Sequence, residues 1–247
     1  MTQDNGGFTI VVDGKECQGH PGETVLTVAA RAGVEIPTLC HDSRLDPMGS
    51  CRMCLVDVEG QGRLQPACTW KACAGQKVET ETPRVDKHRK LLLSLYLADH
   101  EAPAADEPFT PTNQVLEYAK QYGAEARFGR AEAPREGRVD ANPYIHYDPA
   151  QCILCNRCVR YCDEVEAVSA ITLAGRGAHT TIATAGQIGL LESTCELCGG
   201  CIDTCPTGAM REKKPRSLKA TGAPLEVVRS TCNFCGVGCQ VDLNVSG

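Results

Sequence analysis

Cysteine is the residue type in this sequence with the clearest chemical potential, since 17 of 247 residues are cysteines and they fall in close groups. The first group is spaced Cys-x10-Cys-x2-Cys-x13-Cys and comprises Cys40, Cys51, Cys54 and Cys68. Four thiolates can hold a [2Fe–2S] cluster, and the small residues before Cys51 let backbone amides approach its sulfides. Zinc would use the same ligands but usually takes paired Cys-x2-Cys turns, so the spacing favours iron.

Two further groups share the spacing Cys-x2-Cys-x2-Cys-x3-Cys. In two-cluster ferredoxins three cysteines of each run bind one [4Fe–4S] cluster, and the last crosses to the other. This pattern predicts one cluster on Cys152, Cys155, Cys158 and Cys205, and a second on Cys195, Cys198, Cys201 and Cys162. Pro206 follows the second run as usual, whereas Asp163 follows the first.

A last group, Cys232, Cys235 and Cys239, offers three thiolates and is a possible incomplete [4Fe–4S] site. It would hold a cluster only with a fourth ligand from elsewhere. The two remaining cysteines are interpreted as ordinary thiols, with Cys17 in a strand and Cys73 in a loop. His41 follows a ligand directly and is placed to hydrogen-bond near the first cluster.

The elements around the cysteines predict an α+β fold. Asp13-Gly14 indicates a hairpin, and Gly33 ends the helix that the apolar residues after Thr24 predict. Expected strands are 8–12, 15–18, 55–58 and 78–82. Expected helices are 25–30, 85–98 with an apolar stripe of Leu91, Leu92, Leu95 and Tyr96, and 114–122. The domains expected are 1–84 and 143–215, separated by a helix and linker over 85–142 and followed by a hinge and tail over 216–247. The basic stretch 211–219 is interpreted as a solvated linker.

Composition narrows the function. The net charge of −6 and 4% aromatic content argue against a nucleic-acid binder. Without a signal sequence or an apolar span, we expect a cytoplasmic protein that is not inserted in a membrane, and a reducing compartment favours metal ligation over disulfides. The sequence has no G-x-G-x-x-G element, so we expect no nicotinamide site within it.

The order of these motifs resembles the iron–sulfur G subunit of complex I and the N-terminal region of NAD-linked, molybdenum- or tungsten-dependent formate dehydrogenase α subunits. The segment Thr231–Cys239 is similar to the opening of the molybdopterin oxidoreductase domain. The resemblance implies a β-grasp [2Fe–2S] ferredoxin domain followed by a bacterial-type double [4Fe–4S] ferredoxin domain.

One departure from that family concerns a His-x3-Cys-x2-Cys-x5-Cys cluster site after the leucine-rich helix. Counting from His100, the three cysteine positions hold Ala104, Glu107 and Asn113. We therefore expect no cluster there and interpret His100 as an ordinary surface histidine.

The favoured function is electron transfer through one [2Fe–2S] and two [4Fe–4S] clusters. By resemblance, the partners are an NAD(P)H-oxidising flavoprotein and a molybdopterin, formate dehydrogenase-like catalytic unit. No residue is expected to act as acid, base or nucleophile, because the chain lacks a substrate site. The alternatives are the truncated N-terminal part of a formate dehydrogenase α subunit, the diaphorase subunit of an NAD-linked hydrogenase, which the tail after Lys219 disfavours, and a zinc-stabilised scaffold.

Overall fold

The computed structural model describes residues 6–100, 112–129, 135, 140–213, 226–232 and 236–245. The chain divides into two compact units, Met1–Lys213 and Lys214–Gly247. The three larger cysteine groups all lie in the first unit, which is therefore the part of the molecule that matters most for the chemistry.

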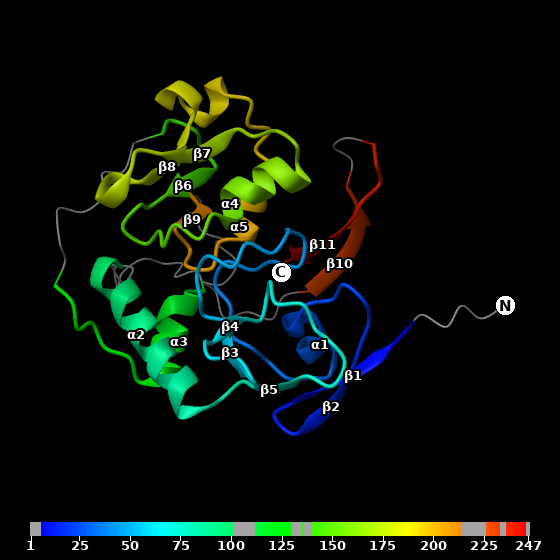
Figure 1. Cartoon of the computed structure of the whole chain (residues 1–247). Helices are drawn as coiled ribbons and strands as arrows, with labels where there is room; N and C mark the ends of the chain where they lie inside the picture. Colours follow the sequence, from blue (N-terminus) through cyan, green and yellow to red (C-terminus); the bar gives the residue numbers. More distant parts are fainter. Residues whose placement is uncertain are drawn as a thin grey trace. The chain divides into compact units, whose positions relative to one another are not determined.

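A five-stranded mixed sheet forms the first part of this unit (Figure 1), with the strand order β2-β1-β5-β3-β4. The strands are β1 (Phe8–Val12), β2 (Lys15–Gly19), β3 (Leu55–Val58), β4 (Gln65–Pro66) and β5 (Lys77–Glu79). β5 runs parallel to β1, and the other pairs are antiparallel. The hairpin between β1 and β2 turns at Asp13 (φ 50°) and Gly14 (φ 76°), as the sequence predicts.

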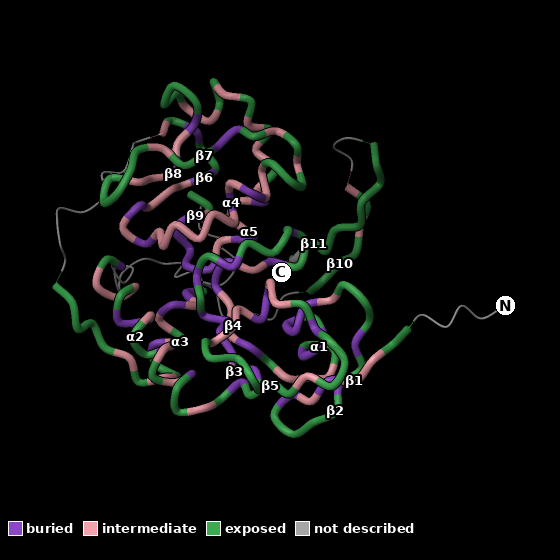
Figure 2. Tube along the Cα trace, viewed as in Figure 1, coloured by how far each residue is buried: buried purple, intermediate pink, exposed green. Residues whose placement is uncertain are grey.

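Helix α1 (Val25–Arg31) packs its apolar side against this sheet. Thr24 caps the helix by accepting a hydrogen bond from the Thr27 backbone N–H at 3.2 Å. Four helix residues are buried together with apolar residues of β1, β3 and β5, and Figure 2 shows this buried core. The resulting core includes Ile10, Val12, Val25, Leu26, Val28, Ala29, Val56, Val58 and Val78.

Helices α2 (Pro83–Asp99) and α3 (Gln114–Tyr122) lie side by side (Figure 1). The expected apolar stripe of α2 is partly wrong, because Leu91 and Leu95 are about half exposed whereas Leu93 is fully buried. Arg89 is also fully buried. Its guanidinium donates to the carbonyl oxygens of Met53 and Leu55, both at 3.3 Å, and this contact sets which face of α2 is turned inward.

The second part of the first unit is built from two small antiparallel sheets and short helices. β6 (Ile145–Tyr147) pairs with β9 (Met210–Glu212), and β7 (Ile171–Ala174) pairs with β8 (Thr181–Thr184). Helices α4 (Arg157–Arg160) and α5 (Gly200–Asp203) follow the cysteine loops, and α4 continues as a π-helix over Tyr161–Val165. Single 3-10 turns occupy Gly177–His179, Ala185–Gln187 and Leu190–Glu192.

The start of the expected basic linker is instead a strand. Arg211 and Glu212 belong to β9 and pair with His146 and Ile145 of β6. The Arg211 guanidinium lies 3.6 Å from the Asp148 carboxylate. Backbone pairing to a strand this far back in the sequence is a long-range contact that local composition does not reveal.

The second unit, described by itself, contains one hairpin of β10 (Glu226–Thr231) and β11 (Gln240–Val245). Val228, Val241 and Leu243 of this hairpin are partly exposed. No helix in the described ranges is long and apolar enough to cross a membrane.

Candidate iron–sulfur cluster sites

The first cysteine set lies in a loop between α1 and β3 and in the turn after β4. Cys40, Cys51, Cys54 and Cys68 are all buried, with exposed fractions of 1, 3, 1 and 1%. The backbone N–H of Cys40 donates to Cys51 Sγ, and that of Cys51 donates to Cys40 Sγ, both at 3.4 Å. The loop therefore directs amide donors to the sulfur atoms, which is how proteins stabilise ligating thiolates.

Gly49 allows this loop to close. Its φ is +68°, and a Cβ atom there would lie 3.2 Å from Thr69 Cγ2. A side chain at this position would meet both a strained backbone and a close neighbour. The small residue expected from the sequence is thus required at the point where the chain turns toward Cys51.

The buried thiols of this set disfavour one another's ionisation. The side-chain contact with Cys68, then burial, holds the pKa of Cys54 well above its ordinary value. In the pair of Cys40 and Cys51, the hydrogen bond from Cys51 lowers the pKa of Cys40 to about 4 while that of Cys51 is raised. Several buried thiolates in one place require a positive partner, and iron of a cluster would supply it.

The two later cysteine runs share a backbone conformation. Leu154 (φ 54°) donates its N–H to Cys152 Sγ, and Leu197 (φ 57°) donates its N–H to Cys195 Sγ, both at 3.4 Å. Asn156 and Gly199, also at positive φ, then begin α4 and α5. Leucine at positive φ is uncommon, and the same feature twice marks two copies of one loop built to present sulfur.

The last cysteine of the second run joins the first run. Cys152, Cys155, Cys158 and Cys205 line one small cavity together with residues of β6, β8 and β9. The Met210 N–H donates to Cys205 Sγ at 3.4 Å. Burial, then the neighbouring Cys155, Cys205 and Cys152, holds the pKa of Cys158 well above its usual value. The four side chains are brought together as the ferredoxin pattern predicts.

The complementary set also gathers across the two runs. Burial, followed by the charges of Cys198, Cys195 and Cys162, raises the pKa of Cys201 to about 12. Cys162 Sγ accepts the N–H of Ala170 at 3.2 Å. Cys162 lies in the π-helix, where a proline at position 163 would remove an N–H from the helix interior, and this accounts for Asp163 in place of the usual proline.

The three sets differ in their depth below the surface. The first is buried throughout, the second contains buried Cys158 among half-buried partners, and the third includes exposed Cys198. Among the described residues no group of three or more His, Cys, Asp or Glu side chains has the close spacing that a single metal ion needs. Ligation of iron by these sets remains a prediction that the geometry fits.

The last cysteine group lies in the second unit. Cys232 donates its N–H to the Cys239 carbonyl at 2.8 Å, so the two residues face each other across the β10–β11 hairpin. Cys239 is exposed, and Cys235 lies outside the described residues. The two cysteines outside all sets are placed as expected, with Cys17 buried in β2 and Cys73 exposed in a loop.

His100 corrects one expectation, because it is not a surface residue. It is 9% exposed, and Asn113 Nδ2 donates to its Nε2 at 2.8 Å. Burial lowers the pKa of His100, which keeps the ring neutral and able to accept this bond. Asn113 also caps α3, whereas Ala104 and Glu107 lie outside the described residues. An amide thus partners the histidine where a cysteine was considered.

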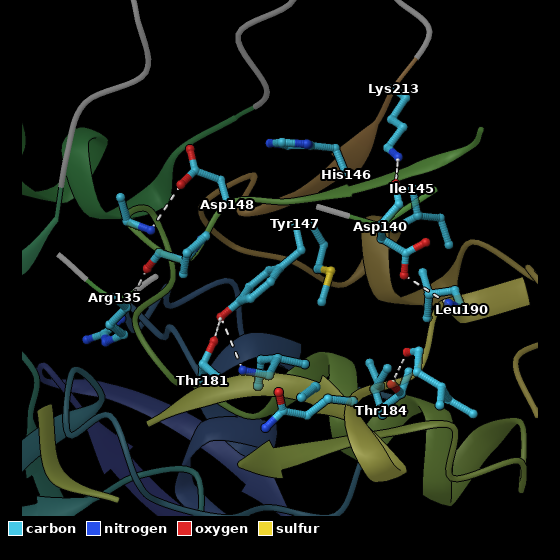
Figure 3. Close-up of a pocket in the computed structure, with 18 residues that line it drawn as sticks. Arg135, Asp140, Ile145, His146, Tyr147, Asp148, Thr181, Thr184, Leu190 and Lys213 are labelled. Atoms are coloured by element: carbon cyan, nitrogen blue, oxygen red, sulfur yellow. Dashed lines mark hydrogen bonds between the residues drawn. The ribbon is translucent and has the colours of Figure 1, made fainter. Parts of the chain in front are cut away.

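A pocket of about 660 Å³ shares Tyr147 with the small cavity of the second cysteine set (Figure 3). Its lining is largely apolar, and several of its polar side chains are engaged. Lys213 donates to the carbonyls of Asp140 and Asn142, and the Tyr147 hydroxyl accepts the Ile182 N–H at 3.2 Å. The pocket therefore offers little to orient a polar substrate.

Comparison with known proteins gives two family matches. Residues 7–83 match the 2Fe-2S iron-sulfur cluster binding domain, and residues 142–211 match the ferredoxin-like domain of NADH-quinone oxidoreductase subunit 3. The chain thus carries a 2Fe–2S ferredoxin domain followed by a ferredoxin-like 4Fe–4S domain.

Whole-chain relatives agree with these matches. The NADH-quinone oxidoreductase G 2 subunit of Rhizobium meliloti is 38% identical over 94% of this chain and 27% of its own length. NADPH-Fe(3+) oxidoreductase subunit alpha of Geobacter sulfurreducens is 33% identical over 95% of this chain and 27% of its own length. A chain in the crystal structure of an NAD+-reducing [NiFe]-hydrogenase in the H2-reduced state superposes with a TM-score of 0.71 at 27% identity, over 85% of this chain and 91% of that one.

These comparisons support a relationship to the G subunits of NADH-quinone oxidoreductase. The chain spans only about a quarter of the length of the curated relatives described above.

Proposed function

We propose that this chain relays electrons through one [2Fe–2S] and two [4Fe–4S] clusters between an NAD(P)H-oxidising flavoprotein and a catalytic unit. The observation that carries the proposal is the grouping of twelve cysteines into three sets of four, with Cys205 and Cys162 exchanged between the two ferredoxin-like runs. When bound, the clusters supply one-electron chemistry at low potential. The mixed sheet with α1 packed on it supports a β-grasp assignment for the first domain.

The residues of the chain hold, orient and shield the sulfur ligands. Backbone N–H groups donate to Cys40, Cys51, Cys152, Cys162, Cys195 and Cys205. Such hydrogen bonds to ligating sulfur raise the reduction potential of a centre relative to one without them. Around Cys40 and Cys51, the side chains of Leu39, Met53 and Leu93 are fully buried and keep water away from the first set.

The differing depth of the three sets supports an order within the relay. The first set shares one apolar cluster with Ile153 and Cys155 of the second, so these two are neighbours inside the protein. Exposed Cys198 places the third set nearest the solvent among them. A redox partner would exchange electrons most readily at this outer set, because electron transfer between proteins requires close approach.

The identity of the catalytic unit rests on narrower grounds. The tail motif of Cys232, Cys235 and Cys239 supports a molybdopterin, formate dehydrogenase-like unit. The structural match to a chain of an NAD+-reducing [NiFe]-hydrogenase favours a second candidate, a hydrogenase electron-transfer subunit, since 91% of that chain is covered. Both candidates use the same three cysteine sets.

Elemental analysis of anaerobically purified protein tests the relay. Three clusters predict about 10 iron atoms per chain with matching sulfide, and about 14 if the Cys232 group finds a fourth ligand. Cys158→Ser should lose about four of these, whereas the control Cys73→Ser, at an exposed cysteine outside the sets, should lose none. Little iron with abundant zinc would refute the proposal, and molybdenum, tungsten or nickel in a co-purifying partner would distinguish the two candidates.

A further inference from the structure

A buried carboxylate joins the loop of the first cysteine set to the ferredoxin-like domain. Asp42 is 8% exposed, and its Oδ2 accepts from Thr204 Oγ1 at 2.8 Å and from Arg157 Nη2 at 3.2 Å. Arg157 Nε in turn donates to Thr204 Oγ1 at 3.0 Å. The three side chains therefore form a closed triangle of hydrogen bonds, in which Asp42 is 115 and 162 residues away from its two partners in the sequence.

Each corner of this triangle is close to a predicted cluster ligand. Asp42 lies two residues after Cys40, while Arg157 and Thr204 directly precede Cys158 and Cys205. The latter two cysteines line the same small cavity. A hydrogen bond at Asp42 consequently connects the backbone that presents the first set to both backbone segments that present the second.

Further contacts brace the same loop. Arg44 donates through its backbone N and its Nε to Asp42 Oδ1, at 3.0 and 2.9 Å, and through Nη1 to Asp203 at 2.7 Å. Its guanidinium also lies 4.8 Å from the ring centroid of Tyr161, the residue before Cys162. Arg44 thus extends the network from Asp42 toward the third set.

A second link lies a few residues further along. Arg160 donates to the Asp46 carbonyl, and the Asp46 N–H donates to Glu164 Oε2 at 2.9 Å. Arg160 and Glu164 are themselves paired at 2.8 Å. This link holds the same loop without a carboxylate from the first domain, so Asp42 remains the anionic centre of the contact.

Charge as well as geometry depends on Asp42. Its single carboxylate faces the guanidinium groups of both Arg157 and Arg44, and the Arg157 side chain is only 13% exposed. A buried cation without a counter-charge is strongly unfavourable and projects its field onto its neighbours. Those neighbours are the ligands of the first and second sets.

We propose that Asp42 is a positioning residue that fixes the spacing between the first and second cluster sites and balances the charge between them. This inference rests on the proposed relay and deepens it, because it assigns the junction between two of its centres to one side chain. Asp42 need touch neither cluster, since it acts through Arg157 and Thr204.

The test uses the full chain with its clusters. Asp42→Asn removes the charge but keeps an acceptor, and Thr204→Val removes the bridging hydroxyl while keeping volume and charge. Glu23→Gln is the matched control, because Glu23 pairs with Arg31 at 2.6 Å within the first domain and away from the cysteines. The readouts are midpoint potentials from an anaerobic titration followed by electron paramagnetic resonance, and the magnetic interaction between the reduced first and second centres.

We expect Asp42→Asn to raise the midpoint potentials of the first and second centres, because the positive charges of Arg157 and Arg44 then lack their counter-ion. Thr204→Val should alter the magnetic interaction with little change in potential. Glu23→Gln should match the unmodified protein in both.

Unchanged potentials in Asp42→Asn together with an unchanged magnetic interaction in both variants would overturn the inference while leaving the relay intact. If Asp42→Asn does not accumulate, Thr204→Val decides, and a magnetic interaction equal to that of the unmodified protein overturns the positioning role. Absence of clusters from the unmodified protein is a different result, which refutes the proposed function itself.

Discussion

The two cysteine loops of the ferredoxin-like domain have the same backbone and different surroundings. Leu154 and Leu197 adopt φ values of 54° and 57° and make matching N–H to sulfur bonds of 3.4 Å. After the first loop, however, Arg157 reaches the buried Asp42, whereas after the second, Gly200 lies against the Tyr161 ring and Cys198 is exposed. One loop design thus presents sulfur in both places, and what packs on the loop decides how deep the site lies.

The largest test of this comparison removes the ligand that each loop receives from the other. Cys205→Ala should remove the cluster of the first loop, because Cys205 lies with Cys152, Cys155 and Cys158, and Cys162→Ala should remove that of the second. Each variant should lose about four iron atoms per chain. Iron analysis combined with electron paramagnetic resonance would identify which signal disappears. If Cys205→Ala removed the same signal as Cys201→Ala, the loops would be self-contained and the exchange wrong.

The difference in depth predicts unequal lability. Exposure to air or a chelator should remove the cluster at the third set faster than the one at the second, because Cys198 is exposed whereas Cys158 is only 8% exposed. Time courses of the two resonance signals would measure the ratio. The same decay rate for both signals would mean that burial of the ligands does not control access to the iron.

Gly200 sharpens the comparison at the start of α5. A Cβ atom there would clash with the ring of Tyr161, whereas the equivalent position in the first loop carries the full side chain of Arg157. Gly200→Ala should therefore lower the free energy of unfolding by about 1–3 kcal/mol through overpacking. Anaerobic urea unfolding would measure it, and Tyr161→Ala in the same chain should restore part of the loss. A double variant no more stable than Gly200→Ala would show that the ring is not the obstacle.

The smallest effect concerns the residues that begin α4 and α5. Asn156→Ala and Gly199→Ala should each cost about 1 kcal/mol, because alanine is disfavoured at positive φ. No atom lies within 4 Å of a Cβ at Gly199, so this cost would come from the backbone alone. Asn156→Gly serves as the control and should stay within a few tenths of a kcal/mol of the unmodified protein. Urea unfolding that ranked Asn156→Gly below Asn156→Ala would contradict the shared conformation.

Local signals in the sequence predicted much of the first domain. Asp13-Gly14 specified the hairpin, and the apolar residues after Thr24 specified α1, because both depend on neighbours in the chain. The last strand was expected over 78–82 and is observed over Lys77–Glu79. Such a shift is ordinary, since strand ends are set by pairing partners rather than by propensity.

Features that depend on distant partners were missed. The burial of Arg89 needs carbonyl acceptors from β3 and the loop before it, and that of His100 needs Asn113. The cysteine spacing indicated which side chains gather, yet nothing in it revealed the positive φ of Leu154 and Leu197 or the contact of Asp42 with Arg157. Motif spacing reports the ligands, whereas the groups that set their environment come from elsewhere in the chain.

Arg89 has a consequence for inheritance of the first domain. The matched family region ends at residue 83, but a fragment cut there would leave the Met53 and Leu55 carbonyls without their guanidinium donor. It would also uncover Leu39 and Cys40, which Leu93 of α2 and Val115 of α3 help to cover. Each buried carbonyl left unpaired costs about 1–3 kcal/mol. The smallest piece that recombination could transfer as a working module therefore extends through α3, to Tyr122.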